Sequence, residues 1–386
     1  MILGIWPIPD SKEITTKIIR HKYLYVRPEF TIFNNLRLYS FVHGNHYILA
    51  GNNATTICLC ALNKKDQLVS LACNLSIYDK QDEKCSYVIN PHLFGVIYVN
   101  LKDKDSKIRT YISLNNGKNF RPFKLEDESS KCQNSDCHVE LDLKCSSDYI
   151  KNNFPEKWIV IFRGTYQREG VYRRHTFLSF DGGRTWKILD FNIDKLLVLN
   201  HGGLLLAAES KTGIIWYSYD DGLNWYSKNL RAYNFIVMKP LEYPNNLIVA
   251  AINYQQQKNI DSSFFINFSS VISSLYLITD SSCQNDDFEA WHTPRYYGSC
   301  FQGQILSYLK KKSTALCVDN RNFILPSIQT CPCSLEDFQW YHRINLSEPN
   351  YYFKNNLCTL DKLSTFTQRA KICRDGGIAL NELDGY

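Results

Sequence analysis

The chain has 386 residues, 44% of them hydrophobic and 14% aromatic, which is enough for a large core in one to three domains. Tyr and Phe are abundant and Met occurs only twice, so the composition favours β-strands over helices. The net charge of +6 is scattered apart from short runs such as Lys310–Lys312, and this pattern excludes an extended nucleic-acid-binding surface. We predict no nucleic-acid partner.

Cysteine content and sequons point to an oxidising, secretory compartment. The chain has fourteen cysteines and four Asn-x-Ser/Thr sequons, at Asn53, Asn74, Asn267 and Asn345. Residues 1–10 lack the basic and then apolar segments of a signal peptide, and no window of 18 uncharged apolar residues occurs. We therefore expect the sequence to be part of a longer secretory-pathway protein.

The N-terminal region has one interpretable pattern. Residues 1–30 stay unassigned, whereas short apolar runs alternate with turns from Phe33 to Leu62, as in strand–turn–strand units. Cys58 and Cys60 have no partner Cys or His pair at zinc-ligand spacing, so we expect them on one face of a strand.

Three copies of the pattern Ser-x-Asx-x-Gly-x-x-aromatic follow, at 113–120, 179–186 and 218–225. The Asx side chain closes a turn on nearby backbone N–H groups, Gly supplies a positive φ, and the aromatic ring begins the next strand. This is the Asp-box of β-propeller blades, in which the acidic residues are structural and not catalytic. The predicted box residues are Ser113, Asn115, Gly117, Phe120, Ser179, Asp181, Gly183, Trp186, Ser218, Asp220, Gly222 and Trp225.

The spacing of the boxes predicts the blades. The second and third boxes lie 39 residues apart, close to the ~40–50 residues of a four-stranded blade. The longer first interval is explained by a polar insertion at 126–157, within which Cys132 and Cys137 are close enough for a loop-closing disulfide. The apolar run Trp158–Phe162 then begins the next blade.

Beyond the third box we expect three more strands and then a different kind of domain. The strands are predicted at Phe235–Lys239, Leu247–Asn253 and Ser274–Thr279, which completes an all-β partial propeller over residues 31–280. Residues 281–386 contain seven cysteines and form a small disulfide-held module. Zinc is the competing interpretation, but Cys331-Pro332-Cys333 lacks zinc-ribbon spacing, so we predict no metal and no cofactor.

The module carries the landmark of a known family. Gly298–Gln304 and Lys310–Cys317 precede Cys331-Pro332-Cys333-Ser334-Leu335-Glu336-Asp337-Phe338, and this order after Asp-box blades resembles sortilin and the vacuolar protein sorting receptors. The resemblance implies the C-terminal blades of a ten-bladed propeller followed by a ten-cysteine module. It also implies the disulfides Cys283–Cys317 and Cys300–Cys331.

The chain departs from the family pattern at two places. Trp340 stands where the family has a cysteine, which leaves the partners of Cys333, Cys358 and Cys373 open. The family captures a peptide carboxylate with an arginine in the propeller tunnel, and the matching segment Asn63–Ser70 contains no arginine. No ligand-binding residue is therefore assigned.

The resemblance implies a binding function and not an enzyme. The expected protein is the luminal part of a type I receptor of Golgi, endosome or cell surface, held in the membrane only through a span outside this chain. It would bind propeptides, neuropeptides or lysosomal proteins as cargo for Golgi-to-endosome transport. One alternative is a secreted propeller scaffold. The other is a sialidase-like glycosidase, for which Arg163, Arg168, Glu169, Arg173 and Arg174 are candidates; we interpret these as exposed hairpin charges.

Apolar runs such as Leu93–Val99 suggest strands that are covered on both faces. A partial ring leaves its end blades uncovered, so we expect residues 1–386 to self-associate when expressed alone. Sedimentation of the isolated chain as a monodisperse monomer would contradict this expectation.

Overall fold

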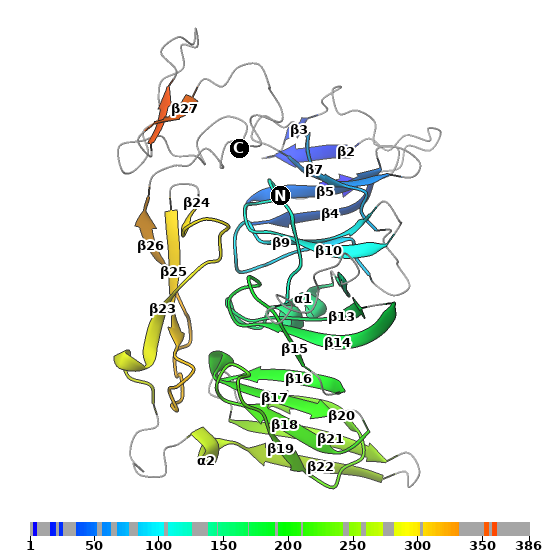
Figure 1. Cartoon of the computed structure of the whole chain (residues 1–386), viewed down its shortest axis with the longest axis vertical. Coiled ribbons are helices and arrows are strands. Elements are labelled where there is room, and N and C mark those ends of the chain that lie inside the picture. The colour runs from blue at the N-terminus through cyan, green and yellow to red at the C-terminus, as the bar shows by residue number, and fades with distance from the viewer. Residues whose placement is uncertain are drawn as a thin grey trace.

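The computed structural model is almost entirely β-structure (Figure 1). It describes residues 3–5, 16–20, 23–25, 36–51, 56–62, 68–76, 84–103, 107–125, 138–144, 146–168, 170–189, 192–209, 211–241, 247–255, 260–272, 282–301, 304–331, 351–354 and 357–360. The expected disulfide Cys132–Cys137, the sequons Asn53 and Asn345, and the cysteines Cys333 and Cys373 lie outside the described residues.

Five consecutive antiparallel sheets, here called blades A to E, form the propeller part. Blade A contains β4 (Leu36–Val42), β5 (Asn45–Gly51), β6 (Ile57–Leu62) and β7 (Leu68–Cys73). Blade B contains β8 (Tyr87–Ile89), β9 (Ile97–Lys102), β10 (Ile108–Ser113) and β11 (Arg121–Pro122). Blade C contains β12 (His138–Leu141), β13 (Val160–Arg168), β14 (Val171–Ser179) and β15 (Lys187–Leu189). Blade D contains β16 (Ile193–Leu199), β17 (Leu204–Glu209), β18 (Ile214–Ser218) and β19 (Tyr226–Asn229), and blade E contains β20 (Phe235–Pro240), β21 (Ile248–Gln255) and β22 (Ile260–Asn267).

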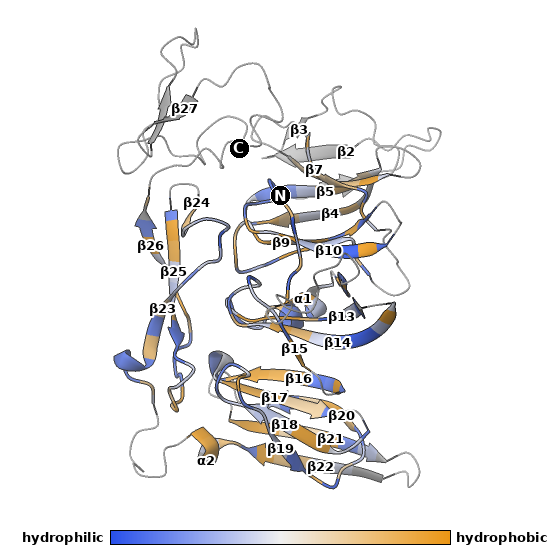
Figure 2. Cartoon of the chain, in the orientation of Figure 1, coloured by the Kyte–Doolittle hydropathy of each residue, from blue (hydrophilic) through white to orange (hydrophobic). Residues whose placement is uncertain are grey.

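The hydrophobic core lies between the blades, which stack on one another (Figures 1 and 2). On β9, Ile97 and Val99 join the cluster shared with blade A, while Tyr98 joins the cluster shared with blade C. On β17, Leu205 packs toward blade C and Leu206 toward blade E. Because successive residues of a strand point to opposite faces, a strand covered on both faces needs an unbroken apolar run. Ile97–Val99 of β9 and Leu204–Ala208 of β17 are such runs.

The three Asp-boxes occupy equivalent places, each in the turn between the third and fourth strands of blades B, C and D. In the central box, Ser179 Oγ donates to Asp181 Oδ1 at 2.8 Å and accepts from Gly183 N at 2.8 Å. Asp181 also accepts from Thr185 N at 2.9 Å, and Gly183 has φ +95°. The other two boxes repeat the Ser-to-Gly and Asx-to-backbone bonds, at Ser113, Asn115, Gly117, Ser218, Asp220 and Gly222. The same side-chain pattern therefore builds the same turn in each blade.

We expect Asp181→Ala to lower the free energy of unfolding by about 1–2 kcal/mol, because it removes the acceptor for the turn's N–H groups. Urea unfolding of the chain measures this loss. Asp220→Ala, at the equivalent position of blade D, is the matched variant and should lose a similar amount. A variant that unfolds like wild type yet no longer binds ligand would show that Asp181 has a binding role instead.

The strands of blade E agree only in part with those predicted from the sequence. Its third strand is β22 (Ile260–Asn267), which the sequence did not predict, and the strand predicted at Ser274–Thr279 lies outside the described residues. Several of its apolar side chains are exposed: Ile236, Val237, Leu241, Ile252 and Phe265. Self-association of the isolated chain stays a prediction.

A second, smaller sheet belongs to the cysteine module. It consists of β23 (Phe288–His292), β24 (Cys300–Phe301), β25 (Gln304–Lys311) and β26 (Ser327–Thr330), with β25 paired to the other three. Disulfides join Cys283 to Cys317 and Cys300 to Cys331, the two pairs that the family resemblance implies.

The cysteine module runs along one edge of the blade stack, across the Asp-box turns (Figure 1). Arg295 Nη1 donates to Leu114 O at 3.0 Å in the first box region, and Tyr296 OH donates to Asn119 O at 3.2 Å. Farther along, Lys310 Nζ lies 2.6 Å from Asp221 Oδ2 in the third box. The module therefore contacts the box turns of blades B and D directly.

Smaller elements complete the structure. A three-stranded sheet of β1 (Leu3–Ile5), β2 (Thr16–Arg20) and β3 (Tyr23–Tyr25) lies near the N-terminus, and β27 (Tyr351–Lys354) pairs with β28 (Leu357–Leu360). The helices α1 (Ser147–Asn153) and α2 (Ser269–Ile272) are short. In the described part of the chain, no helix has the length and apolar character needed to span a membrane.

Cys58 and Cys60 both lie buried on β6, two residues apart, which places them on one face of the strand as expected. Cys58 forms a disulfide with Cys73, its cross-strand partner on β7. Cys60 is a free thiol, and burial raises its pKa to about 11. It is therefore an unreactive core residue at physiological pH.

Candidate ligand-binding pocket between two blades

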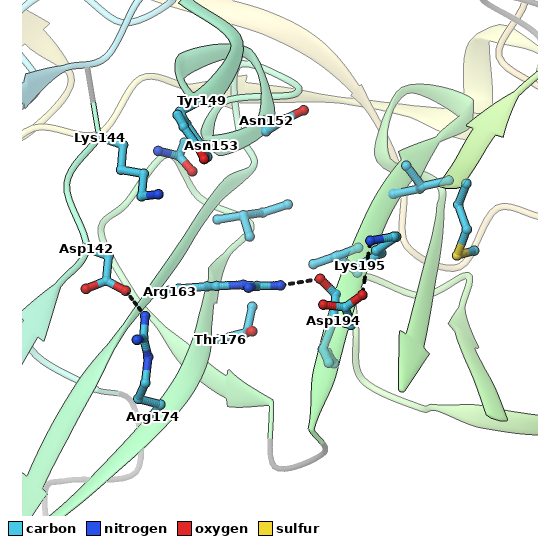
Figure 3. A pocket seen from close by; sticks show the side chains of 15 residues that line it. Asp142, Lys144, Tyr149, Asn152, Asn153, Arg163, Arg174, Thr176, Asp194 and Lys195 are labelled. Atoms are coloured by element: carbon cyan, nitrogen blue, oxygen red, sulfur yellow. Dashed lines mark hydrogen bonds and ion pairs between the residues drawn. The ribbon is translucent and has the colours of Figure 1, made fainter. Parts of the chain in front are cut away.

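A pocket of about 510 Å³ lies between blades C and D (Figure 3). Its walls come from the segment after β12, from α1, from β13 and β14, and from β16 of the next blade. The lining residues are Asp142, Lys144, Tyr149, Asn152, Asn153, Ile161, Arg163, Arg174, Thr176, Ile193, Asp194, Lys195, Leu196, Leu197 and Met238. The volume suits several residues of a peptide or a small molecule.

An ion pair defines the blade C wall. Arg174 on β14 donates to the Oδ2 atom of Asp142, which follows β12. Lys84, in the segment before β8 of blade B, has its Nζ atom 3.7 Å from the other carboxylate oxygen, Oδ1. The Asp142 carboxylate is therefore shared between two cations and is not free to attract a third.

Arg163 extends from β13 across the pocket toward blade D (Figure 3). Its Nη2 donates to the backbone carbonyl of Asp194, at the start of β16. The Asp194 carboxylate instead pairs with Lys195 at 3.0 Å. Arg163 therefore contacts a neutral oxygen, and a guanidinium has five N–H donors, more than this contact uses.

Lys144 contributes a second cation that faces no carboxylate among the pocket residues. Its Nζ lies 4.1 Å from the ring centroid of Tyr149 on α1, a cation–π contact. With Arg163, Arg174 and Lys195, it gives the pocket four cationic side chains against the two carboxylates of Asp142 and Asp194. The pocket therefore has an excess positive charge.

An apolar surface lies beside these charges, formed by Ile161, Ile193, Leu196, Leu197 and Met238. The cations and this apolar surface together suit an anionic group that is attached to an apolar one.

On β12, which precedes the pocket wall, the pKa of Glu140 is raised, mainly because burial disfavours its charged form. Lys84 opposes this rise, and Asp142 adds to it by repelling the Glu140 carboxylate.

The structure changes two interpretations made from sequence. Residues 126–157 were predicted to be a surface insertion, but β12 and α1 lie within this range and form the first strand of blade C and one wall of the pocket. Arg163 and Arg174 were predicted to be hairpin charges; both are exposed, and both line the pocket. Arg173 is an exposed residue of the same hairpin, while the side chains of Arg168 and Glu169 lie outside the described residues.

The remaining predicted site residues do not gather at this pocket. The Asp-box side chains are occupied in their own turns, and Trp186 Nε1 donates to Gly183 O at 2.9 Å. Asn74 and Asn267 are exposed, as glycosylation requires. The sequence did carry a signal for the pocket, because Asp142 with Lys144 and Asp194 with Lys195 place opposite charges close together in the chain, but such pairs are common on solvated surfaces.

Comparison with known families identifies the chain. Residues 88–239 match the family described as sortilin, neurotensin receptor 3, and residues 239–386 match its C-terminal family. The chain belongs to the sortilin family. These two adjoining matches include blades B to E and the whole cysteine module.

The relatives of this sortilin-family chain include a receptor and a vacuolar sorting protein. It is 25% identical over 262 residues to the VPS10 domain-containing receptor SorCS2 of Homo sapiens, covering 63% of the chain and 22% of the receptor. It is 27% identical over 237 residues to the vacuolar protein sorting/targeting protein 10 of Schizosaccharomyces japonicus, covering 57% of the chain and 16% of that protein. The chain thus spans about a fifth of the length of these relatives.

A solved structure also resembles it weakly. A GH74 xyloglucanase from Xanthomonas campestris aligns with a TM-score of 0.30 and 10% identity, covering 58% of this chain and 36% of the enzyme. That likeness is too slight to bear on function.

Proposed function

We propose that this sortilin-family chain is the luminal ligand-binding region of a sorting receptor that captures peptide or protein cargo for transport from the Golgi to endosomes and lysosomes or the vacuole. Family membership supports the receptor class. The observation that carries the binding role is the pocket between blades C and D, with its excess positive charge and adjoining apolar surface.

The pocket's chemistry defines the cargo segment that would fit. Arg163 and Lys144 face no carboxylate inside the pocket, so an acidic group of the cargo would supply the missing charge. The apolar side chains Ile161, Leu197 and Met238 would cover a neighbouring apolar residue. We therefore propose that the cargo segment places an acidic group next to an apolar residue.

The same arrangement favours binding over catalysis. Glycoside hydrolysis needs paired carboxylates that are free to act on the substrate. Both pocket carboxylates are held in ion pairs, Asp142 with Arg174 and Asp194 with Lys195. We propose that the chain is not an enzyme and expect no hydrolysis of fluorogenic sialosides or glucosides.

A luminal location fits the chemistry of the chain. Disulfides join Cys58 to Cys73, Cys283 to Cys317 and Cys300 to Cys331, and such bonds persist in oxidising compartments. The exposed sequons at Asn74 and Asn267 are accessible to the glycosylation machinery of that compartment. We propose that both carry glycans, and that the receptor is anchored as a type I membrane protein.

Charge reversal at the pocket tests the binding role. The chain is probed with a synthetic peptide array in which acidic and apolar positions are varied, and the best peptide is then titrated. We expect Lys144→Glu with Arg163→Glu to weaken binding at least ~tenfold, because two attractive contacts become repulsive. Lys228→Glu, on the exposed strand β19, is the matched control and should bind like wild type. Equal binding of basic and acidic peptides, or equal losses in both variants, would contradict the proposal.

A further inference from the structure

His201 joins three parts of the molecule. It lies in the short turn Asn200–Gly202 between β16 and β17 of blade D, and its side chain is 6% exposed. Its Nδ1 atom is 2.8 Å from Glu156 Oε1, in the segment that leads into β13 of blade C. Its Nε2 atom is 2.8 Å from the backbone carbonyl of Arg321 in the cysteine module. One imidazole therefore contacts two blades and the module.

Both groups that face the ring are acceptors. A carboxylate and a backbone carbonyl accept hydrogen bonds and donate none, while a neutral imidazole has only one N–H. The two hydrogen bonds therefore form together only in the protonated imidazolium. After loss of the proton, one ring nitrogen faces an oxygen with lone pair against lone pair, in a nearly buried place.

Hydrogen bonds next to His201 also attach the module to blade D. Asn200, next to His201, donates through Nδ2 to Cys317 O at 2.9 Å and accepts through Oδ1 from Asp319 N at 2.7 Å. Because Cys317 forms the disulfide with Cys283, these bonds tie the disulfide-linked segment to blade D.

The charged groups around the ring come from each packed element. Blade C contributes Glu156, followed by Lys157, which lies over the Tyr308 ring. The module contributes the ion pair of Asp319 with Arg321 at 2.6 Å, and Lys311, whose ammonium donates to Ala315 O at 2.6 Å. Burial disfavours the imidazolium, but Glu156, Asp319 and the Arg321 carbonyl together outweigh it and raise the pKa of His201.

We propose that His201 is a proton-operated latch, in which the imidazolium holds the cysteine module against blades C and D and loss of the proton releases one of its two contacts. The latch is a feature of the domain junction and is independent of the ligand pocket. The stability of the contact between the module and the propeller then depends on the pH of the compartment.

The direction of this dependence follows from the raised pKa. A free histidine has a pKa near ~6.5. A group whose pKa is raised in the folded state contributes its full stabilisation below that value and loses it as the pH rises through the folded-state pKa. The latch is therefore closed in acidic compartments and weakens as the pH rises above ~6.5.

Two other histidines at blade junctions behave in the opposite way. His43 in blade A lies 2.9 Å from Asn90 O of blade B, and His92 lies 2.9 Å from Phe154 O of blade C. Within the described part of the chain each ring makes one such contact, which the neutral ring satisfies, and burial is the main cause that lowers the pKa of both. They serve as internal controls for His201.

The test combines a histidine titration by NMR with hydrogen exchange of the full chain, corrected for the intrinsic pH dependence of exchange. We expect His201 to titrate above the free-histidine value, and His43 and His92 below it. Backbone protection at residues 317–321 should fall as the pH rises through the His201 titration. His201→Gln should remove that pH dependence, while His92→Gln should keep it.

Glu156→Gln provides a second variant if His201→Gln does not fold. It keeps the size of the side chain but removes the charge, so it should move the His201 titration to lower pH and shift the loss of protection with it. An unchanged protection profile in either variant, or a His201 titration below the free value, would overturn the latch.

Discussion

Trp186→Ala is expected to lower the free energy of unfolding by about 3–5 kcal/mol, as a large-to-small change in a packed core. The Trp186 side chain is 1% exposed, and its ring lies 4.8 Å from the Phe123 ring of blade B and 6.1 Å from the Phe162 ring of blade C. The change removes packing on both sides of a blade junction, together with the bond from Nε1 to Gly183 O. Urea unfolding measures the loss of free energy of unfolding. It is followed by circular dichroism because that signal does not depend on the removed tryptophan.

Trp225 provides the matched control because it holds the same box position in blade D but is only partly buried. Trp225→Ala should therefore cost clearly less than Trp186→Ala. Equal losses would show that the box aromatics act through their turns and not through the core between blades, which would contradict the packing argument.

Arg295→Ala is expected to cost about 2–4 kcal/mol and to loosen the cysteine module, because buried acceptors lose their donor. The Arg295 side chain is nearly buried, and its Nη1 donates to Phe94 O at 2.8 Å and to Leu114 O at 3.0 Å. Its guanidinium also stacks on the Phe301 ring at 4.2 Å. One side chain thus connects the module to two loops of blade B.

Limited proteolysis of the link between blade E and the module, together with urea unfolding, measures this effect. Arg121→Ala is the control, because Arg121 is exposed and, among the described residues, contacts the module through Tyr297 and the Tyr296 ring. Its loss should be below about 1 kcal/mol, as for other exposed contacts. Similar protease sensitivity in both variants would contradict a special role for Arg295.

Much of the propeller could be predicted from the sequence because its signals are local. Each Asp-box needs a side-chain acceptor, a hydroxyl and a glycine at fixed offsets, and all three copies build the same hydrogen bonds. The run Leu93–Val99 predicted a strand covered on both faces, and this holds for its second half, because Ile97–Val99 begin β9 and divide between two cores, whereas residues 93–96 lie in the loop before β9.

The pocket could not be predicted in the same way, because its contacts join residues far apart in the chain. Arg174 meets Asp142 across 32 positions, and Arg163 meets Asp194 across 31. The strand β12, which precedes one wall of the pocket, has only four residues, too few to stand out from a polar segment. The strand β22 of blade E was missed for a related reason, since polar residues interrupt its apolar pattern.

The docking of the module on the Asp-box turns could not be predicted from the sequence either. Arg295, Tyr296 and Lys310 are residue types that usually lie on surfaces, and only the folded chain brings them to the backbone carbonyls and the Asp221 carboxylate that they contact. His201 is a similar case, because its two partners are 45 and 120 positions away.

Photo-cross-linking of bound cargo tests the proposed binding site most directly. A peptide chosen from the array carries a photoreactive apolar residue next to its acidic group, and cross-linked chain residues are mapped by mass spectrometry. We predict cross-links to Tyr149, Leu197 and Met238, which line the pocket between blades C and D, and their loss in the Lys144→Glu, Arg163→Glu variant. Cross-links confined to the cysteine module or to the outer strands of the blades, unchanged in that variant, would contradict the binding site.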